Sequence, residues 1–271
     1  MSQNNIEIDK LLLETGSKIY IDEIKTYIVQ PTIRDISEVM QGEKQFFTCI
    51  TYICKTIINI DELKQNKDIT EEDIEIFSQI SSFEYLLGLM SKQPYIFIYF
   101  IQLLKLFFPD YIWELENDNN NVYINMIDIN KINQDTKEEN EDKGFQINKE
   151  NYDLIIEYME KIINLNFDKK DDDYNPINEK AREIAEKLKE SHKKLQELKN
   201  QNGEDYFYAK VINLLRGTGY FDMQTLLDMT IYQLVQTYQR FSLYDGRQIQ
   251  TIYHAAGAEI KDFIDWTQEI K

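Results

Sequence analysis

Glycine and proline are scarce in this chain, and it contains no long hydrophobic run. Only 9 glycines and 4 prolines occur in 271 residues, so few positions carry the residues that tight turns favour. This composition favours long helices and argues against a many-stranded barrel or sandwich. The most apolar run, residues 94–108, contains Gln102 and Lys105 and is shorter than the roughly 20 apolar residues that a membrane span needs. We therefore expect a core helix at this run and no membrane partner.

The common catalytic and cofactor-binding patterns are missing as well. The sequence holds no P-loop, nucleophile elbow, kinase signature or zinc-protease motif. His192 and His254 have no Cys, Ser or second His at a catalytic or metal-ligand spacing, and we expect His254 on a helix surface or in packing. Gly217 and Gly219 lack the strand–glycine–helix context of a phosphate cradle, and the end of a helix explains them. The sequence predicts a protein that is not an enzyme and carries no cofactor.

The sequence also lacks the common metal-binding patterns. Cys49 and Cys54 are the only cysteines, and their separation is not the usual spacing of a zinc or redox pair. We expect both to be small buried hydrophobic side chains. The charge run at residues 168–173 lacks the glycine and the terminal Glu of a calcium loop, so a solvated linker is the better interpretation. No metal site is predicted.

Acidic residues dominate the first two thirds of the chain. The net charge is −18, and residues 1–178 contain 34 acidic and 17 basic side chains, whereas residues 179–271 contain 14 and 13. An acidic surface repels nucleic acid and anionic membranes and favours basic partners. We therefore expect no nucleic-acid partner. An acidic inhibitor that mimics nucleic acid against a host protein remains an alternative, although the acids are scattered among Lys and Ile.

Local patterns predict two hairpins and several capped helices. A first small hairpin is expected where Ile19 and Ile21, and then Tyr27 and Val29, alternate with polar residues. A second hairpin is expected around the Asn and Asp residues 117–121, and residues 130–144 are expected to form an exposed, mobile loop. Capping patterns predict helix starts at the following residues: Thr32, Thr70, Ser81 with Glu84, Asp222, and Thr230 with Gln233.

The segment at residues 175–199 is rich in charged residues of both signs and predicts a long surface helix. Its apolar positions recur at a spacing of three and four residues, and Glu183 and Glu190 each precede a lysine by four residues. The apolar side chains would therefore form a narrow stripe along one edge of this helix. Such a stripe packs along another helix, of the same chain or of a partner. The residues that best fit a partner-binding seam are Ile184, Leu188, Leu195 and Leu198.

These expectations add up to a mainly α fold with small β-hairpins. We expect an acidic α+β domain with two small hairpins at residues 1–165, and a charged linker with a long amphipathic connecting helix at residues 166–205. A small C-terminal helical bundle of short helices is expected at residues 206–271, including one from Thr230 and another through Ala258. Most of its aromatic residues are expected in the core, and some at a partner surface.

Four stretches of the sequence resemble a family of tailed-phage proteins from Firmicutes, the tail assembly chaperones or minor tail proteins. They are YIVQPTIRDISEV, NPINEKAREIAEKLKESHKKLQELK, DMTIYQLVQTYQRF and AAGAEIKDFIDW. The resemblance implies a non-enzymatic protein of the host cytoplasm that binds the tape-measure protein, or another tail protein. It would keep the tape measure soluble until the tail tube polymerises. A structural component of the virion, such as a minor tail or head–tail connector protein, is the alternative.

Overall fold

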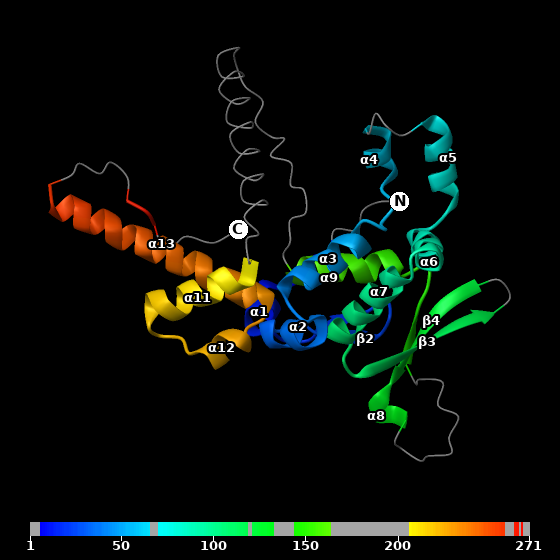
Figure 1. Cartoon of the computed structure of the whole chain (residues 1–271), viewed down its shortest axis with the longest axis horizontal. Helices are drawn as coiled ribbons and strands as arrows, with labels where there is room; N and C mark the ends of the chain where they lie inside the picture. Colours follow the sequence, from blue (N-terminus) through cyan, green and yellow to red (C-terminus); the bar gives the residue numbers. More distant parts are fainter. Residues whose placement is uncertain are drawn as a thin grey trace, which may run out of the picture.

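The fold is mainly helical with two small antiparallel sheets, as the sequence predicted (Figure 1). The computed structural model describes residues 6–65, 70–118, 121–132, 144–163, 206–257, 263–265 and 267. Within these ranges, no helix is both long enough and apolar enough to cross a membrane.

The first hairpin joins β1 (Ile19–Ile21) to β2 (Thr26–Ile28) in an antiparallel pair. The end residues of both strands are buried, and the central Tyr20 and Tyr27 lie opposite each other on the outer face with ring centroids 4.9 Å apart. The predicted hairpin is therefore present, but Tyr27 lies on its exposed face, and Val29 is half-buried just after β2. Side chains alternate between the two faces of a strand, so a shift of one residue moves a side chain to the other face. The cross-strand pair with Tyr20 holds the Tyr27 side chain on the outer face.

The second sheet has the order β3–β4–β5 and confirms the predicted hairpin. Its strands are β3 (Tyr111–Asp118), β4 (Asn121–Asp128) and β5 (Gly144–Ile147). Trp113 of β3 and Phe145 of β5 both lie opposite Met126 in the register, and these side chains face the helices. The short helix α8 (Ile129–Ile132) follows β4, and most of the loop predicted at 130–144 lies outside the described residues.

The predicted caps begin the helices that the sequence assigned to them. Capping boxes are present at Thr32, Thr70, Ser81 and Thr230, and the Asp222 carboxylate accepts a hydrogen bond from Thr225 N. The helices that follow these caps are α2 (Ile33–Met40), α5 (Glu71–Gln79), α6 (Ser82–Lys92), α13 (Ile231–Ala255) and α12 (Met223–Leu227). In each box a side-chain oxygen accepts from a backbone N–H that the helix leaves unpaired.

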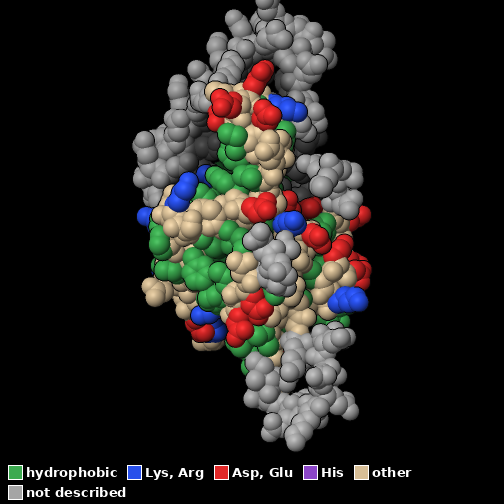
Figure 2. All heavy atoms as spheres, turned by 90° about the vertical axis from the view of Figure 1, so that its right-hand side faces the viewer, with side chains coloured by type: hydrophobic (Ala, Val, Ile, Leu, Met, Phe, Trp, Pro, Cys, Tyr) green, Lys and Arg blue, Asp and Glu red, His purple; other side chains and the backbone are tan. Residues whose placement is uncertain are grey.

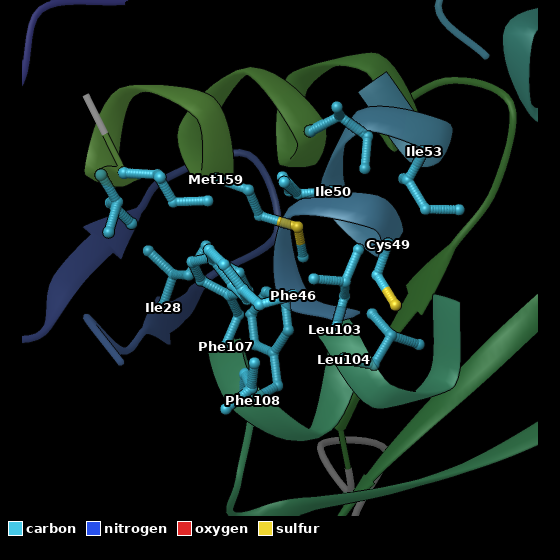
Figure 3. Close-up of a cluster of buried hydrophobic side chains, with 14 of the residues drawn as sticks. Ile28, Phe46, Cys49, Ile50, Ile53, Leu103, Leu104, Phe107, Phe108 and Met159 are labelled. Atoms are coloured by element: carbon cyan, nitrogen blue, oxygen red, sulfur yellow. The ribbon is translucent and has the colours of Figure 1, made fainter. Parts of the chain in front are cut away.

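Three helices supply the centre of the hydrophobic core. They are α3 (Glu43–Cys54), α7 (Pro94–Phe107) and α9 (Tyr152–Ile163). Figure 3 shows their side chains converging with Ile28 of β2, among them Phe46, Ile50, Leu103, Phe107 and Met159. The helix predicted at the most apolar run of the sequence is α7, and its burial explains that composition. Two further helices, α1 (Lys10–Thr15) and α4 (Ile60–Gln65), belong to the first part of the chain.

The C-terminal helices pack directly on this first part. An isolated bridge pairs Thr32 with Thr230, and the Glu43 carboxylate accepts hydrogen bonds from the backbone N–H groups of Phe207 and Tyr208 in α11 (Tyr206–Thr218). A carboxylate at a helix N-terminus is favoured by the helix dipole. Buried side chains of α11, α12 and α13 also join the same hydrophobic core as those of α3, α7 and α9. The domain boundaries near residues 165 and 205 stay predictions, because residues 164–205 lie outside the described ranges.

Helix α13 is longer than the short helices predicted for this part. It runs without a break for 25 residues, through Gly246, which costs about 1 kcal/mol relative to alanine but does not stop a helix. Its first half packs beside α11 and α1, and its second half projects away from the body (Figure 1).

Both cysteines lie in α3: Cys49 is buried, as predicted, and Cys54 is only half-buried. The Cys54 thiol is hydrogen-bonded to the Glu160 carboxyl of α9. Burial raises the pKa of Glu160, and the charge of Glu157 adds to this effect. Burial likewise raises the pKa of Cys49 to about 11 and raises the pKa of Cys54. Both thiols therefore stay protonated near neutral pH and are poor nucleophiles.

We expect Glu160→Gln to increase the free energy of unfolding at pH 7. An acid whose pKa is raised by folding binds its proton more tightly in the folded state, so stability falls as pH rises from the unfolded pKa of about 4.3 through the folded value. The glutamine amide removes this loss and keeps a partner for Cys54. Urea unfolding at pH 4.5 and pH 7 measures the effect, with the exposed Glu150→Gln as the control. A variant that is less stable than the wild type at pH 7 would contradict this explanation.

Candidate functional site

The partner-binding residues predicted from the sequence, Ile184, Leu188, Leu195 and Leu198, lie outside the described residues. Their assignment to a seam stays a prediction, and His192 also lies outside the described residues. His254 is described: it lies on the exposed outer half of α13, consistent with the expected helix-surface position.

The described C-terminal helices and Glu14 of α1 form an open pocket of about 610 Å³, which we call the aromatic groove. It lies between the end of α11, the segment that leads to α12, and α13. Its aromatic lining residues are Tyr220, Phe221, Tyr232, Phe241 and Tyr244. Its principal polar lining residues are Glu14, Gln233, Gln236, Thr237, Arg240 and Asp245.

Two glycines shape the groove. Gly219 has a φ of +66° and follows the last residue of α11, a backbone conformation that glycine adopts without steric cost. Gly217 lies inside the helix instead, where an added Cβ would stand 2.9 Å from the Phe241 ring. The absence of a side chain at Gly217 therefore lets α11 approach α13 closely. Of the two glycines that the sequence offered as a helix end, Gly219 is the one.

The aromatic side chains differ in exposure from the floor of the groove to its rim. Tyr232 is buried, and Phe221 and Phe241 are half-buried. Tyr220 is 91% exposed and Tyr244 is 46% exposed. Tyrosine is enriched among the residues that dominate binding energy at protein interfaces. A packed floor with exposed tyrosines at the rim is an arrangement that can bind the apolar face of a partner helix.

Hydrogen bonds fix the polar side of the floor. The Gln233 side chain donates from Nε2 to the carbonyl of Glu14 over 2.8 Å and accepts from Thr230 N over 2.9 Å. The lining of the groove carries charges of both signs, because Glu14 and Asp245 are acidic and Arg240 is basic. The groove is therefore preorganised by contacts between α1 and α13, which lie far apart in the sequence.

A second aromatic surface lies between α3 and α7. The rings of Tyr52, Tyr95 and Tyr99 have centroids 5.5 to 6.1 Å apart, and Ile98 is exposed nearby on α7. These rings contact one another, so packing between the two helices explains the cluster. Figure 2 faces the right-hand side of Figure 1 and shows hydrophobic side chains at the surface beside acidic ones. The aromatic groove is the stronger candidate for a binding site, because it combines exposed aromatic residues with a concave shape.

Among the described residues, no three His, Cys, Asp or Glu side chains come together as a metal site. Sequence reasoning expected most C-terminal aromatic residues in the core, and it did not identify Tyr220 and Tyr244 as groove residues. The available signal was local: Tyr220 and Phe221 stand between a helix-ending glycine and the helix cap Asp222.

Comparison with family models, with curated proteins and with solved structures finds no match for this chain.

Proposed function

We propose that this protein is a non-enzymatic tail assembly chaperone of a tailed phage. It binds a helical segment of the tape-measure protein in the aromatic groove and keeps that protein soluble in the host cytoplasm until the tail tube polymerises. The observation that carries the proposal is the groove itself, with a packed aromatic floor and the exposed Tyr220 and Tyr244 at its rim.

Two of the four sequence stretches that resemble the phage family contribute to this part of the molecule. The first stretch supplies Thr32, and the stretch DMTIYQLVQTYQRF begins at Asp228 and lines the groove through Phe241. Their bridge between Thr32 and Thr230 anchors the start of α13 on the body. Two of the resembling stretches therefore meet beside the groove, and this supports the proposal.

The physics of the groove suits an amphipathic helix as the partner. Such a helix places side chains spaced by three and four residues into a hydrophobic groove, and aromatic side chains offer large contact areas to it. A tape-measure protein is a long helical chain that would expose many such segments before assembly. The net charge of −18 would keep chaperone-coated complexes apart, since like-charged particles repel one another.

The test is affinity purification of the tagged chain after co-expression with the tape-measure protein of the same phage genome. We expect both proteins to elute together as one complex, and we expect the chain to be absent from purified phage particles. Failure to form the complex, with the chain present in the particles, would contradict the proposal and favour a structural tail or neck component.

A further inference from the structure

A short C-terminal segment, residues 263–265, contacts the outer half of α13. We call residues 263–265 the strap. The Phe263 ring lies over the Arg247 guanidinium, with 4.1 Å from Cζ to the ring centroid, and its centroid is 5.4 Å from that of His254. Ile264 N donates to Gln250 Oε1 over 2.7 Å. A Cβ at Gly246 would stand 2.8 Å from Ile264 Cδ1, so the end of the Ile264 side chain lies directly over Gly246.

The strap site is formed by Gly246, Arg247, Gln250 and His254. Two of these residues, Arg247 and His254, continue the row on α13 that begins with Arg240 of the aromatic groove. Arg240 lines the groove, and Arg247 and His254 follow it at intervals of seven residues. Seven residues are close to two helical turns, so these side chains share one face of the helix. A partner segment that lies in the groove and follows α13 outward therefore reaches the strap.

The strap is held weakly. Phe263 and Ile264 are only half-buried and Asp265 is exposed, and a cation–π contact or a single hydrogen bond gains little when water competes for it. Two hydrogen bonds from Thr267 lower the pKa of Asp265, and the charge of Arg247 adds to this effect. The strap thus presents three side chains in succession: the aromatic Phe263, the aliphatic Ile264 and the ionised Asp265. Arg247 interacts with both Phe263 and Asp265.

We propose that the strap site is a second docking surface for the partner segment of the groove, and that the strap occupies it as an intramolecular competitor. The inference rests on the proposed function and adds the chemistry of the partner. The segment that docks here carries an aromatic side chain for Arg247, a small aliphatic side chain for the space above Gly246, and an acidic side chain close by. Binding of the partner displaces the strap.

The first test needs no tape-measure protein. A fluorescent synthetic peptide of residues 258–271 serves as the probe, and its binding to the full-length chain is measured by anisotropy. We expect Phe263→Ala, which weakens the chain's own strap, to bind the peptide at least threefold more tightly than the wild type. Combining it with Arg247→Ala should abolish the gain. Ile252→Ala, an exposed position on the same helix that none of the strap contacts involves, is the control and should change nothing. Equal binding by the wild type and Phe263→Ala would overturn the proposal.

The second test adds the partner. A tape-measure segment that binds the chain should displace the labelled peptide from Phe263→Ala, and it should bind this variant three- to tenfold more tightly than the wild type. A segment that binds without displacing the peptide would overturn the strap proposal and leave the chaperone function standing. The opposite pattern, peptide binding as expected but no tape-measure binding by any variant, would refute the proposed function instead.

Discussion

Phe46→Ala is expected to lower the free energy of unfolding by about 3 to 5 kcal/mol. Phe46 is fully buried in α3, and its ring centroid lies 5.5 Å from that of Phe47 and 6.2 Å from that of Phe207 in α11. The substitution removes apolar burial and leaves a cavity that the surrounding helices fill only in part. Urea unfolding followed by circular dichroism measures the loss.

The same experiment tests whether the C-terminal helices belong to the core of the first part. Because Phe207 packs on Phe46, we expect a single unfolding transition that moves as a whole to lower urea concentration. Ile98→Ala, at a side chain that is 54% exposed on α7, serves as the control and should change stability by about 0.5 kcal/mol or less. A separate transition of α11 to α13, unchanged by Phe46→Ala, would contradict the shared core.

Tyr220→Ala combined with Tyr244→Ala is expected to weaken the affinity for the tape-measure segment by at least tenfold. Both side chains stand at the rim of the groove and are substantially exposed, so their removal should leave the fold intact. Truncation of an interface side chain that is a hot spot costs about 2 kcal/mol or more, and each 1.4 kcal/mol is about tenfold in affinity. Calorimetric titration of the purified chain with the segment measures the loss.

A matched double variant controls for the general removal of exposed tyrosines. Tyr27 and Tyr208 are 54% and 60% exposed, and neither lines the groove. Tyr27→Ala with Tyr208→Ala should therefore bind the segment as the wild type does. Equal losses in both double variants would show that the groove has no special role in binding.

The parts of the fold that the sequence predicted depend on local chemistry. Thr70, Ser81 and Thr230 each have an acidic or amide side chain three residues later, and this spacing alone suffices to close a capping box. The hairpin at β3 and β4 follows from alternating runs on both sides of a turn-favouring stretch. Such signals need no knowledge of distant residues.

The parts that the sequence did not predict depend on tertiary contacts. Tyr27 faces outward because it pairs with Tyr20 across the hairpin, and α13 continues through Gly246 although glycine disfavours helix. The groove exists only because α1, α11 and α13 meet, and Glu14 lies more than 200 residues before Asp245. The seam residues Ile184 and Leu188 remain a separate prediction outside the described ranges.

The most direct test of the central claim is the soluble fraction of the tape-measure protein in cells that co-express it with this chain. We predict that the wild-type chain keeps most of the tape-measure protein in the supernatant after centrifugation. The chain with Tyr220→Ala and Tyr244→Ala should leave most of it in the pellet, as in cells without the chain. A tape-measure protein that stays equally soluble with the wild type and this variant, or that is insoluble with both, would contradict the claim that the aromatic groove binds and protects it.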